Sequence, residues 1–161
     1  MVIILMGVSG SGKTTVGQLL AGQLAWEFAD GDNYHPRANI KKMRNGVPLT
    51  DADREPWLDE LRAVIAGWIA DEKNGVLACS ALRQVYRERL LVDKQVRFVY
   101  LKAARDVLSQ RLLQRQDHYM KESMLTSQLS TLEEPIDSTI VNANESPAVI
   151  VREIRANLGL T

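Results

Sequence analysis

The chain has 161 residues, of which 45% are apolar and 25% charged, so it is long enough for one globular domain with a core of its own. Its 20 basic and 20 acidic side chains cancel, which excludes a global electrostatic preference for nucleic acid or for an anionic membrane. The single cysteine, Cys79, excludes an internal disulfide, and no apolar run approaches the roughly 20 residues of a membrane helix, so we expect a cytoplasmic protein.

The first elements are a strand, a glycine-rich loop and a helix. Residues 2–6 form an unbroken apolar run, which is typical of a strand buried on both faces and lacks the basic leader of a signal peptide. Residues 7–14 read Gly-Val-Ser-Gly-Ser-Gly-Lys-Thr and match the phosphate-binding pattern of Gly, four residues, Gly, Lys and then Thr or Ser. Apolar residues then recur at helical spacing over 13–24. This order predicts a nucleoside triphosphate site.

Each part of the loop suits that ligand. Its glycines leave no Cβ between backbone and phosphate, and its amides form an anion site with the positive end of the helix. Lys13 adds a mobile cation for the β and γ phosphates, and the Thr14 hydroxyl can ligate Mg²⁺. The residues that we assign to the phosphates are Gly7, Ser9, Gly10, Ser11, Gly12, Lys13, Thr14 and Thr15.

Two carboxylates, Asp30 and Asp32, follow the second predicted strand at residues 26–29. They flank Gly31, and because an unpaired charge is costly to bury they are not expected in the core. One interpretation is an aspartate-rich turn; the other is a role at the metal or at the phosphoryl acceptor.

Residues 33–74 contain no obvious strand and are expected to form a helical insert. Pro36 can open a short helix as its first residue, and Thr50 with the acidic residues after it is typical of the start of a longer helix. An apolar face at a spacing of three and four is formed by Trp57, Leu58, Leu61, Val64, Ile65, Trp68 and Ile69, which we interpret as core. Small kinases with this phosphate loop hold their acceptor in such an insert.

Three further strands are predicted at residues 76–79, 96–101 and 139–141, so the chain should form a five-stranded parallel sheet with helices on both faces. The strand at 76–79 is followed by Ser80, where ATPases of another branch often place an aspartate that holds Mg²⁺. The metal carboxylate is therefore expected from Asp30 or Asp32. Arg83, close to the same strand end, belongs either to a solvated helix face or to an anion site.

A basic helical hairpin at residues 115–135, between the fourth and fifth strands, has the position of a kinase lid. Such lids supply arginines to the transferring phosphate and exclude water. The last helix is expected to start at Ser146-Pro147.

The segment around the acid pair is the most specific part of the sequence. It reads Asp30-Gly31-Asp32-Asn33-Tyr34-His35-Pro36 and continues through Asn39-Ile40, Lys42-Met43, Gly46, Pro48-Leu49, Asp51, Asp53-Arg54 and Pro56-Trp57-Leu58. Later segments are Cys79-Ser80-Ala81-Leu82, Tyr86-Arg87, His118-Tyr119-Met120, Ser127-Gln128 and Leu132-Glu133-Glu134-Pro135. Together they resemble the small P-loop gluconate kinases over residues 2 to about 135. The chain departs from the family at Asp117, where glycine is common, and at Arg83, where lysine is common.

The resemblance implies a single P-loop kinase domain over residues 1–161 that transfers the γ-phosphoryl group of ATP to the terminal hydroxyl of D-gluconate. It implies Lys13, Asp32 and Arg115 as catalytic residues, with Asp32 orienting the acceptor hydroxyl and Arg115 stabilising charge from the lid. Thr14 and Asp30 would hold Mg²⁺, although the roles of Asp30 and Asp32 could be reversed. The expected substrate contacts are Asp32, His35, Arg54, Ser80, Arg83, Arg87 and His118. Arg111 and Asn144 lie where related folds hold the adenine.

Two alternatives remain open at this point. A kinase for shikimate or for a nucleotide would keep the fold and change the acceptor site. A non-catalytic nucleotide switch should carry a guanine-reading Asn-Lys-x-Asp segment, which the sequence lacks. The oligomeric state is also open, with a homodimer as one option.

Overall fold

The computed structural model describes residues 1–115 and 122–161. Its centre is a five-stranded sheet in which every neighbouring pair is parallel, in the order β2-β3-β1-β4-β5. The strands are β1 (Val2–Met6), β2 (Glu27–Asp30), β3 (Gly75–Ala78), β4 (Val96–Lys102) and β5 (Thr139–Asn142). This sheet confirms the predicted fold class.

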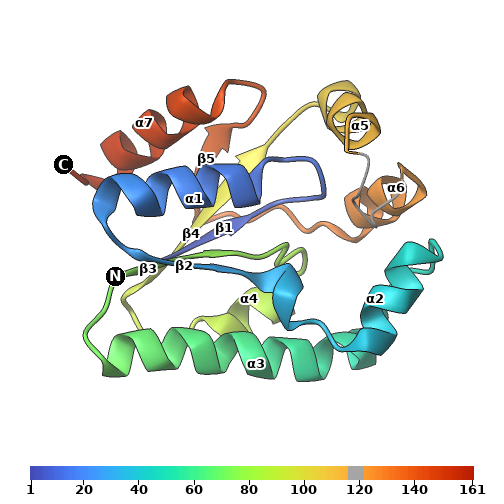
Figure 1. The fold of residues 1–161 in the computed structure, drawn as a ribbon, viewed down its shortest axis with the longest axis horizontal. Helices are drawn as coiled ribbons and strands as arrows, with labels where there is room; N and C mark the ends of the chain where they lie inside the picture. The colour runs from blue at the N-terminus through green and yellow to red at the C-terminus, as the bar shows by residue number, and fades with distance from the viewer. Residues whose placement is uncertain (116–121) are drawn as a thin grey trace.

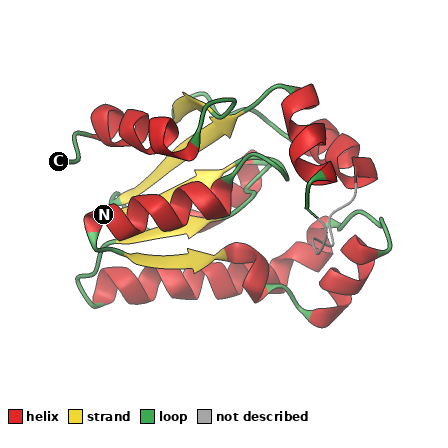
Figure 2. Ribbon diagram, turned by 45° about the horizontal axis from the view of Figure 1, so that its top comes forward, coloured by secondary structure: helices red, strands yellow, loops and turns green. Residues whose placement is uncertain are grey.

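Helices cover both faces of the sheet and the end at which the strands finish (Figures 1 and 2). One face carries α1 (Lys13–Leu24) and α7 (Pro147–Leu158), and the other carries α3 (Asp51–Ala70) and α4 (Gln84–Leu90). Three helices lie beyond the carboxyl ends of the strands: α2 (Arg37–Arg44), α5 (Arg105–Leu113) and α6 (Glu122–Thr131). A short 3-10 turn, η1 (Gly31–Tyr34), follows β2 directly.

The central strand β1 is buried along its whole length because helices pack on both of its faces. Ile3 and Leu5 belong to the core shared with α1 and α7, whereas Ile4 and Met6 belong to the core shared with α3. The alternation follows from the two-residue period of a strand. Both cores hold the strand ends, and hence the loops that follow them, in fixed positions.

The helical segment at 33–74 begins within η1 and contains α2 and α3. Thr50 caps α3: its side chain accepts a bond from the amide of Asp53, whose carboxylate accepts one from the amide of Thr50. Pro36 caps α2 from outside, so the helix begins one residue later than predicted, at Arg37. The predicted inner face of α3 is buried at Trp57 and at three aliphatic residues, with its other members partly buried.

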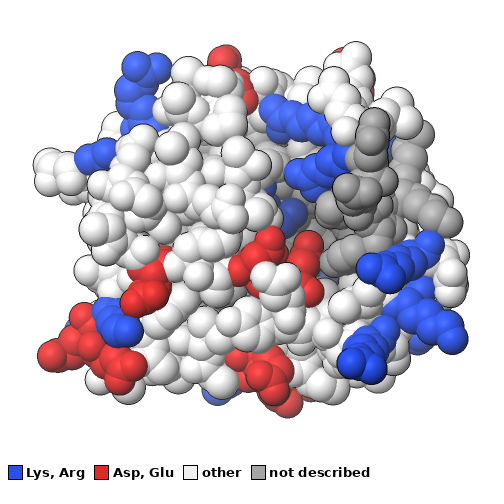
Figure 3. Space-filling model, viewed as in Figure 1, with Lys and Arg blue, Asp and Glu red and all other residues white. Residues whose placement is uncertain are grey.

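Lys and Arg side chains gather on the side of the molecule where α2, α5 and α6 lie (Figure 3). On α2 the basic residues are Arg37, Lys41, Lys42 and Arg44. The chain as a whole is neutral, so this side is locally positive. Within residues 1–115 and 122–161, no helix is both long enough and apolar enough to cross a membrane.

Candidate active site

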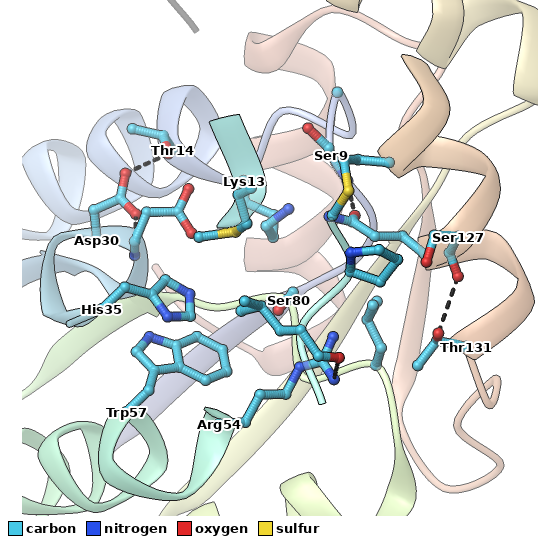
Figure 4. Close-up of a pocket in the computed structure, with 18 of the residues that line it drawn as sticks. Ser9, Lys13, Thr14, Asp30, His35, Arg54, Trp57, Ser80, Ser127 and Thr131 are labelled. Carbon is cyan, nitrogen blue, oxygen red and sulfur yellow. Dashed lines mark hydrogen bonds between the residues drawn. The ribbon is translucent and has the colours of Figure 1, made fainter. Parts of the chain in front are cut away.

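A cavity of about 420 Å³ opens at the carboxyl ends of the strands, among the glycine-rich loop, η1, α3 and α6 (Figure 4). Ligand sites of open parallel sheets lie at this edge, because the loops after the strands converge there. The described residues that line it include Ser9, Gly10, Gly12, Lys13, Thr14, Thr15, Asp30, Asp32, His35, Arg54, Trp57, Ser80 and Arg115.

The glycine-rich loop joins β1 to α1 and reaches the cavity with most of its predicted phosphate contacts. Gly10 has φ of 87°, and a Cβ at that position would lie 3.0 Å from the carbonyl oxygen of Leu108. Glycine is therefore needed here for both backbone conformation and space. Gly7 and Ser11, which we also assigned to ATP, lie behind the cavity surface, where Gly7 donates its amide to Ser80 O at 3.3 Å.

Lys13 lies at the start of α1 with its ammonium group among acidic and basic neighbours. Its Nζ donates to the carbonyl oxygen of Val8 at 3.0 Å, within the same loop. Burial lowers the pKa of Lys13, and the nearby carboxylate of Asp32 opposes that shift. A partly desolvated ammonium group beside the backbone amides of the glycine-rich loop is well suited to bind phosphate oxygens.

Asp30 connects the two loops that carry the acid pair and the phosphate site. Its Oδ2 accepts a 2.7 Å bond from Thr14 Oγ1, and its Oδ1 accepts a 2.9 Å bond from the amide of Asp32. Gly31 lies between the two aspartates, and a Cβ there would be only 2.8 Å from the carbonyl oxygen of Ala78. The hydroxyl and carboxylate oxygens that meet here are the ligand type that Mg²⁺ prefers, so the residues fit the expected metal.

His35 and Trp57 form one wall of the cavity (Figure 4). Their rings stack with centroids 4.3 Å apart and an interplanar angle of 12°. The indole nitrogen of Trp57 donates to Gly31 O at 2.7 Å, which fixes the stack relative to the acid pair. Burial, with a smaller contribution from the charge of Arg54, lowers the pKa of His35 to about 4, so its ring is neutral near pH 7.

Arg54 of α3 also lines the cavity, and the NH1 nitrogen of its guanidinium group makes two hydrogen bonds within the protein. Its NH1 donates to Leu49 O at 2.8 Å and to the hydroxyl of Tyr86 at 3.1 Å. Tyr86 in turn donates to the carboxylate of Asp51. The remaining donors of Arg54 can serve a carboxylate, for which a planar guanidinium is well shaped.

Arg83 and Arg87, two of the predicted substrate contacts, do not line the cavity in the structure. Arg87 is buried, and its guanidinium donates to Ala81 O at 2.7 Å and to Glu133 O at 2.7 Å, so it holds the backbone around α4. Arg83 pairs with Asp51 at 2.6 Å and Glu133 at 3.5 Å. Sequence spacing placed both near a strand end but could not show which way their side chains turn.

Arg111 contacts the glycine-rich loop and the residue before Asn144, although neither Arg111 nor Asn144 lines the cavity. Arg111 donates to Gly10 O at 3.2 Å and to Ala143 O at 2.6 Å, which joins the loop after β5 to the phosphate loop. The side-chain oxygen of Asn144 accepts a 2.9 Å hydrogen bond from the amide of Ala104. Their assignment to the adenine stays a prediction.

The predicted lid contributes Arg115 and several residues of α6 to the cavity. The side chain of Gln128 accepts the amide of Ser9 at 2.7 Å, so α6 contacts the phosphate loop directly. Met124, Ser127 and Thr131 line the cavity beside it. These four residues had no predicted site role, although the Ser127-Gln128 pair belongs to the family resemblance and could have indicated one. His118, a predicted substrate contact, lies outside the described residues.

The chain is similar to known kinases over nearly all of its length. The family model described as shikimate kinase matches residues 9–158. A gluconokinase of Gluconobacter oxydans is 43% identical over 160 residues, covering 94% of this chain and 88% of the relative.

Solved structures give the same result. A gluconokinase from Sinorhizobium meliloti is 41% identical, with a TM-score of 0.84 over 98% of this chain and 90% of that one. An unliganded sugar kinase from Janibacter is 34% identical, with a TM-score of 0.92 over 99% of this chain and 95% of that one. Both cover the strands, the glycine-rich loop and the helices that form the cavity.

Proposed function

Because the chain belongs to the gluconokinases, within the fold of the shikimate kinase family, we propose that it transfers the γ-phosphoryl group of ATP to D-gluconate, giving 6-phosphogluconate and ADP. One observation carries this proposal: a phosphate loop, an acid pair and an arginine, Arg54, face a single cavity of about 420 Å³. The first two elements suit phosphoryl transfer, and the third suits an acceptor that carries a carboxylate.

The donor side of the cavity would hold the triphosphate. Loop amides and Lys13 neutralise phosphate charge, which is the main requirement of a reaction with little covalent chemistry for the protein to perform. Thr14 and Asp30 would hold Mg²⁺, which when bound supplies further positive charge at the β and γ phosphates. The 2.7 Å bond between these two residues supports that assignment.

On the acceptor side we assign the alignment of the hydroxyl to Asp32. Its amide is fixed by Asp30 at 2.9 Å, and its side chain faces the cavity next to Lys13. A carboxylate in this position can accept the proton of the attacking hydroxyl, as the catalytic aspartate of protein kinases does. Both proton transfer to Asp32 and in-line attack require gluconate to be held close to Asp32 and to the γ-phosphate. We assign this binding role to Arg54 and His35.

The segments around the cavity then divide into functional parts of one domain, residues 1–161. Residues 33–74 would form the acceptor-binding insert, and residues 115–135 the lid that brings Arg115 to the transferring group. The contact between Gln128 and Ser9 supports a lid that rests on the phosphate loop.

The expectation of a cytoplasmic protein also stays a prediction.

An assay of ADP release across a panel of acceptors tests this function. We expect turnover with D-gluconate in the presence of ATP and Mg²⁺, and much weaker turnover with other aldonates. Activity restricted to another acceptor, or ATP hydrolysis that no acceptor stimulates, would overturn the proposal.

Shikimate is the second candidate acceptor, because the matching family model carries its name. Like gluconate, it combines a carboxylate with hydroxyl groups, so Arg54 could serve either compound. The same assay separates the two, since kcat/KM for shikimate should be at least roughly a hundredfold lower if the site is built for gluconate.

A further inference from the structure

Asn39 of α2 lies behind the wall of the cavity and contacts the ring of His35. It is buried, and its Nδ2 donates to the backbone carbonyl of Asp53 at 2.8 Å. The same nitrogen lies 3.3 Å from His35 Nδ1. An amide nitrogen carries two hydrogens, so one can point at each acceptor.

The carbonyl of Asp53 fixes the orientation of this amide. A backbone carbonyl only accepts hydrogen bonds, so the atom of Asn39 that faces it must be the nitrogen and not the oxygen. The reversed amide would place two oxygens 2.8 Å apart inside the protein. Nδ2 is therefore a donor toward His35, and His35 Nδ1 must accept.

An accepting Nδ1 determines where the proton of the neutral ring resides. A neutral imidazole has one N–H, so the proton must be on Nε2. Among residues 1–115 and 122–161, Nε2 has no protein partner, while the ring itself lines the cavity. The stack on Trp57 holds the plane of the ring, and the contact with Asn39 orients Nδ1 within it.

We propose that Asn39 is a positioning residue that sets the tautomer of His35, so that His35 presents a neutral Nε2–H donor to a hydroxyl oxygen of the acceptor. A neutral donor suits a hydroxyl and leaves the carboxylate of the acceptor to the permanent cation of Arg54. The lowered pKa of His35, about 4, agrees with a ring that stays neutral. This inference rests on the proposed function for the identity of the acceptor, but the tautomer itself does not.

Nitrogen-15 NMR of the ligand-free wild-type protein tests the tautomer directly. The chain has two histidines, so a His118→Ala sample assigns the two rings. We expect His35 at about pH 7 to show a protonated Nε2 and an unprotonated Nδ1. Protonation at Nδ1, at both nitrogens, or an averaged mixture of the two would overturn the proposal, whatever the acceptor is.

Two variants test the part played by Asn39, with Asn45→Asp, at the residue that caps the C-terminus of the same helix, as the matched control. In Asn39→Ala the ring should sample both tautomers. In Asn39→Asp the carboxylate can only accept, so Nδ1 should become protonated, and the variant should also melt at a lower temperature because an oxygen then faces the carbonyl of Asp53. Both should raise the KM for gluconate by about three- to tenfold, with the KM for ATP unchanged, as expected for one lost hydrogen bond. Asn45→Asp should leave the tautomer and both KM values as in the wild type.

Addition of gluconate to the labelled wild-type protein completes the test. We expect the Nε2 resonance of His35 to shift while that nitrogen stays protonated. No shift at saturating gluconate would overturn the contact. Absence of gluconate turnover in the wild type, with the tautomer as expected, would instead reject the proposed function and leave the role of Asn39 intact.

Discussion

Thr14 and Asp30 are joined by a 2.7 Å hydrogen bond from hydroxyl to carboxylate, which ties the first turn of α1 to the end of β2. The other oxygen of the same carboxylate accepts the amide of Asp32. Asp30 therefore shapes the turn and also faces the phosphate site. The turn interpretation therefore holds for Asp30, and its place in the cavity lining is compatible with the metal role that we propose for it.

The acid pair should divide into two kinetic phenotypes. Asp32→Asn keeps the size of the side chain but removes its charge, so kcat for gluconate should fall by roughly 10² to 10⁴ while ATP still binds. Asp30→Asn should instead raise the Mg²⁺ concentration needed for half-maximal rate. Steady-state assays across a magnesium series, with melting temperatures for both variants, check this. Near wild-type turnover of Asp32→Asn would remove its catalytic assignment.

Lys13→Met should give a folded protein with almost no turnover. The bond from Nζ to Val8 O is the polar contact that the structure gives this ammonium group, and burial already disfavours its charge. Loss of Lys13 should therefore cost little stability, whereas phosphate charge would lose its mobile cation. Thermal melting and ADP release measure the two effects. A variant with near-normal kcat would show that the loop does not hold the reacting phosphates.

Arg54 and Arg87 should respond in opposite ways to the same replacement by Met. Arg54→Met removes the proposed carboxylate contact, so the KM for gluconate should rise by roughly tenfold to a hundredfold; its bonds to Leu49 O and the Tyr86 hydroxyl are only partly buried, so it should lose less stability than the Arg87 variant. Arg87→Met leaves the buried carbonyl of Ala81 and the partly buried carbonyl of Glu133 without their donor, and it should cost about 3 kcal/mol of unfolding free energy.

Urea denaturation and substrate kinetics on both variants check this contrast. In folded Arg87→Met, the KM for gluconate should stay close to that of the wild type. A large rise in that KM at full stability would restore the substrate role that the sequence suggested for Arg87.

His35 should make the protein less stable as the pH falls. Its pKa is lowered from 6.5 to about 4 in the folded protein, chiefly by burial. Between these values the unfolded chain binds a proton that the folded protein does not. The contribution of neutral His35 to the free energy of unfolding is therefore fully present above pH 6.5 and is lost as the pH falls toward 4. Melting temperatures across this window should fall less steeply for His35→Gln. Equal slopes for variant and wild type would show that His35 titrates normally.

The sequence by itself determined the fold class and the family, and it located the glycine-rich loop that lines the cavity. An apolar run, a glycine-rich loop and an amphipathic helix are local patterns, and their physical causes act over neighbouring residues. Residues 13–24 were predicted as a helix and form one, and Thr50 was expected to cap the longer helix and does so. The gluconokinase assignment came from a long colinear segment and is confirmed by the relatives.

Only the tertiary structure decided which side chains share the cavity. Arg54 and Arg87 are both arginines on helices near strand ends, yet one lines the cavity and the other is buried against backbone carbonyls. Asn39 had no predicted role, because the role that we propose depends on its side-chain nitrogen contacting both Asp53 O and His35 Nδ1. These placements depend on contacts of α2, α3 and α4 with segments distant in the sequence, which no local pattern encodes. The direction in which a polar side chain turns is set by the partners that packing brings to it.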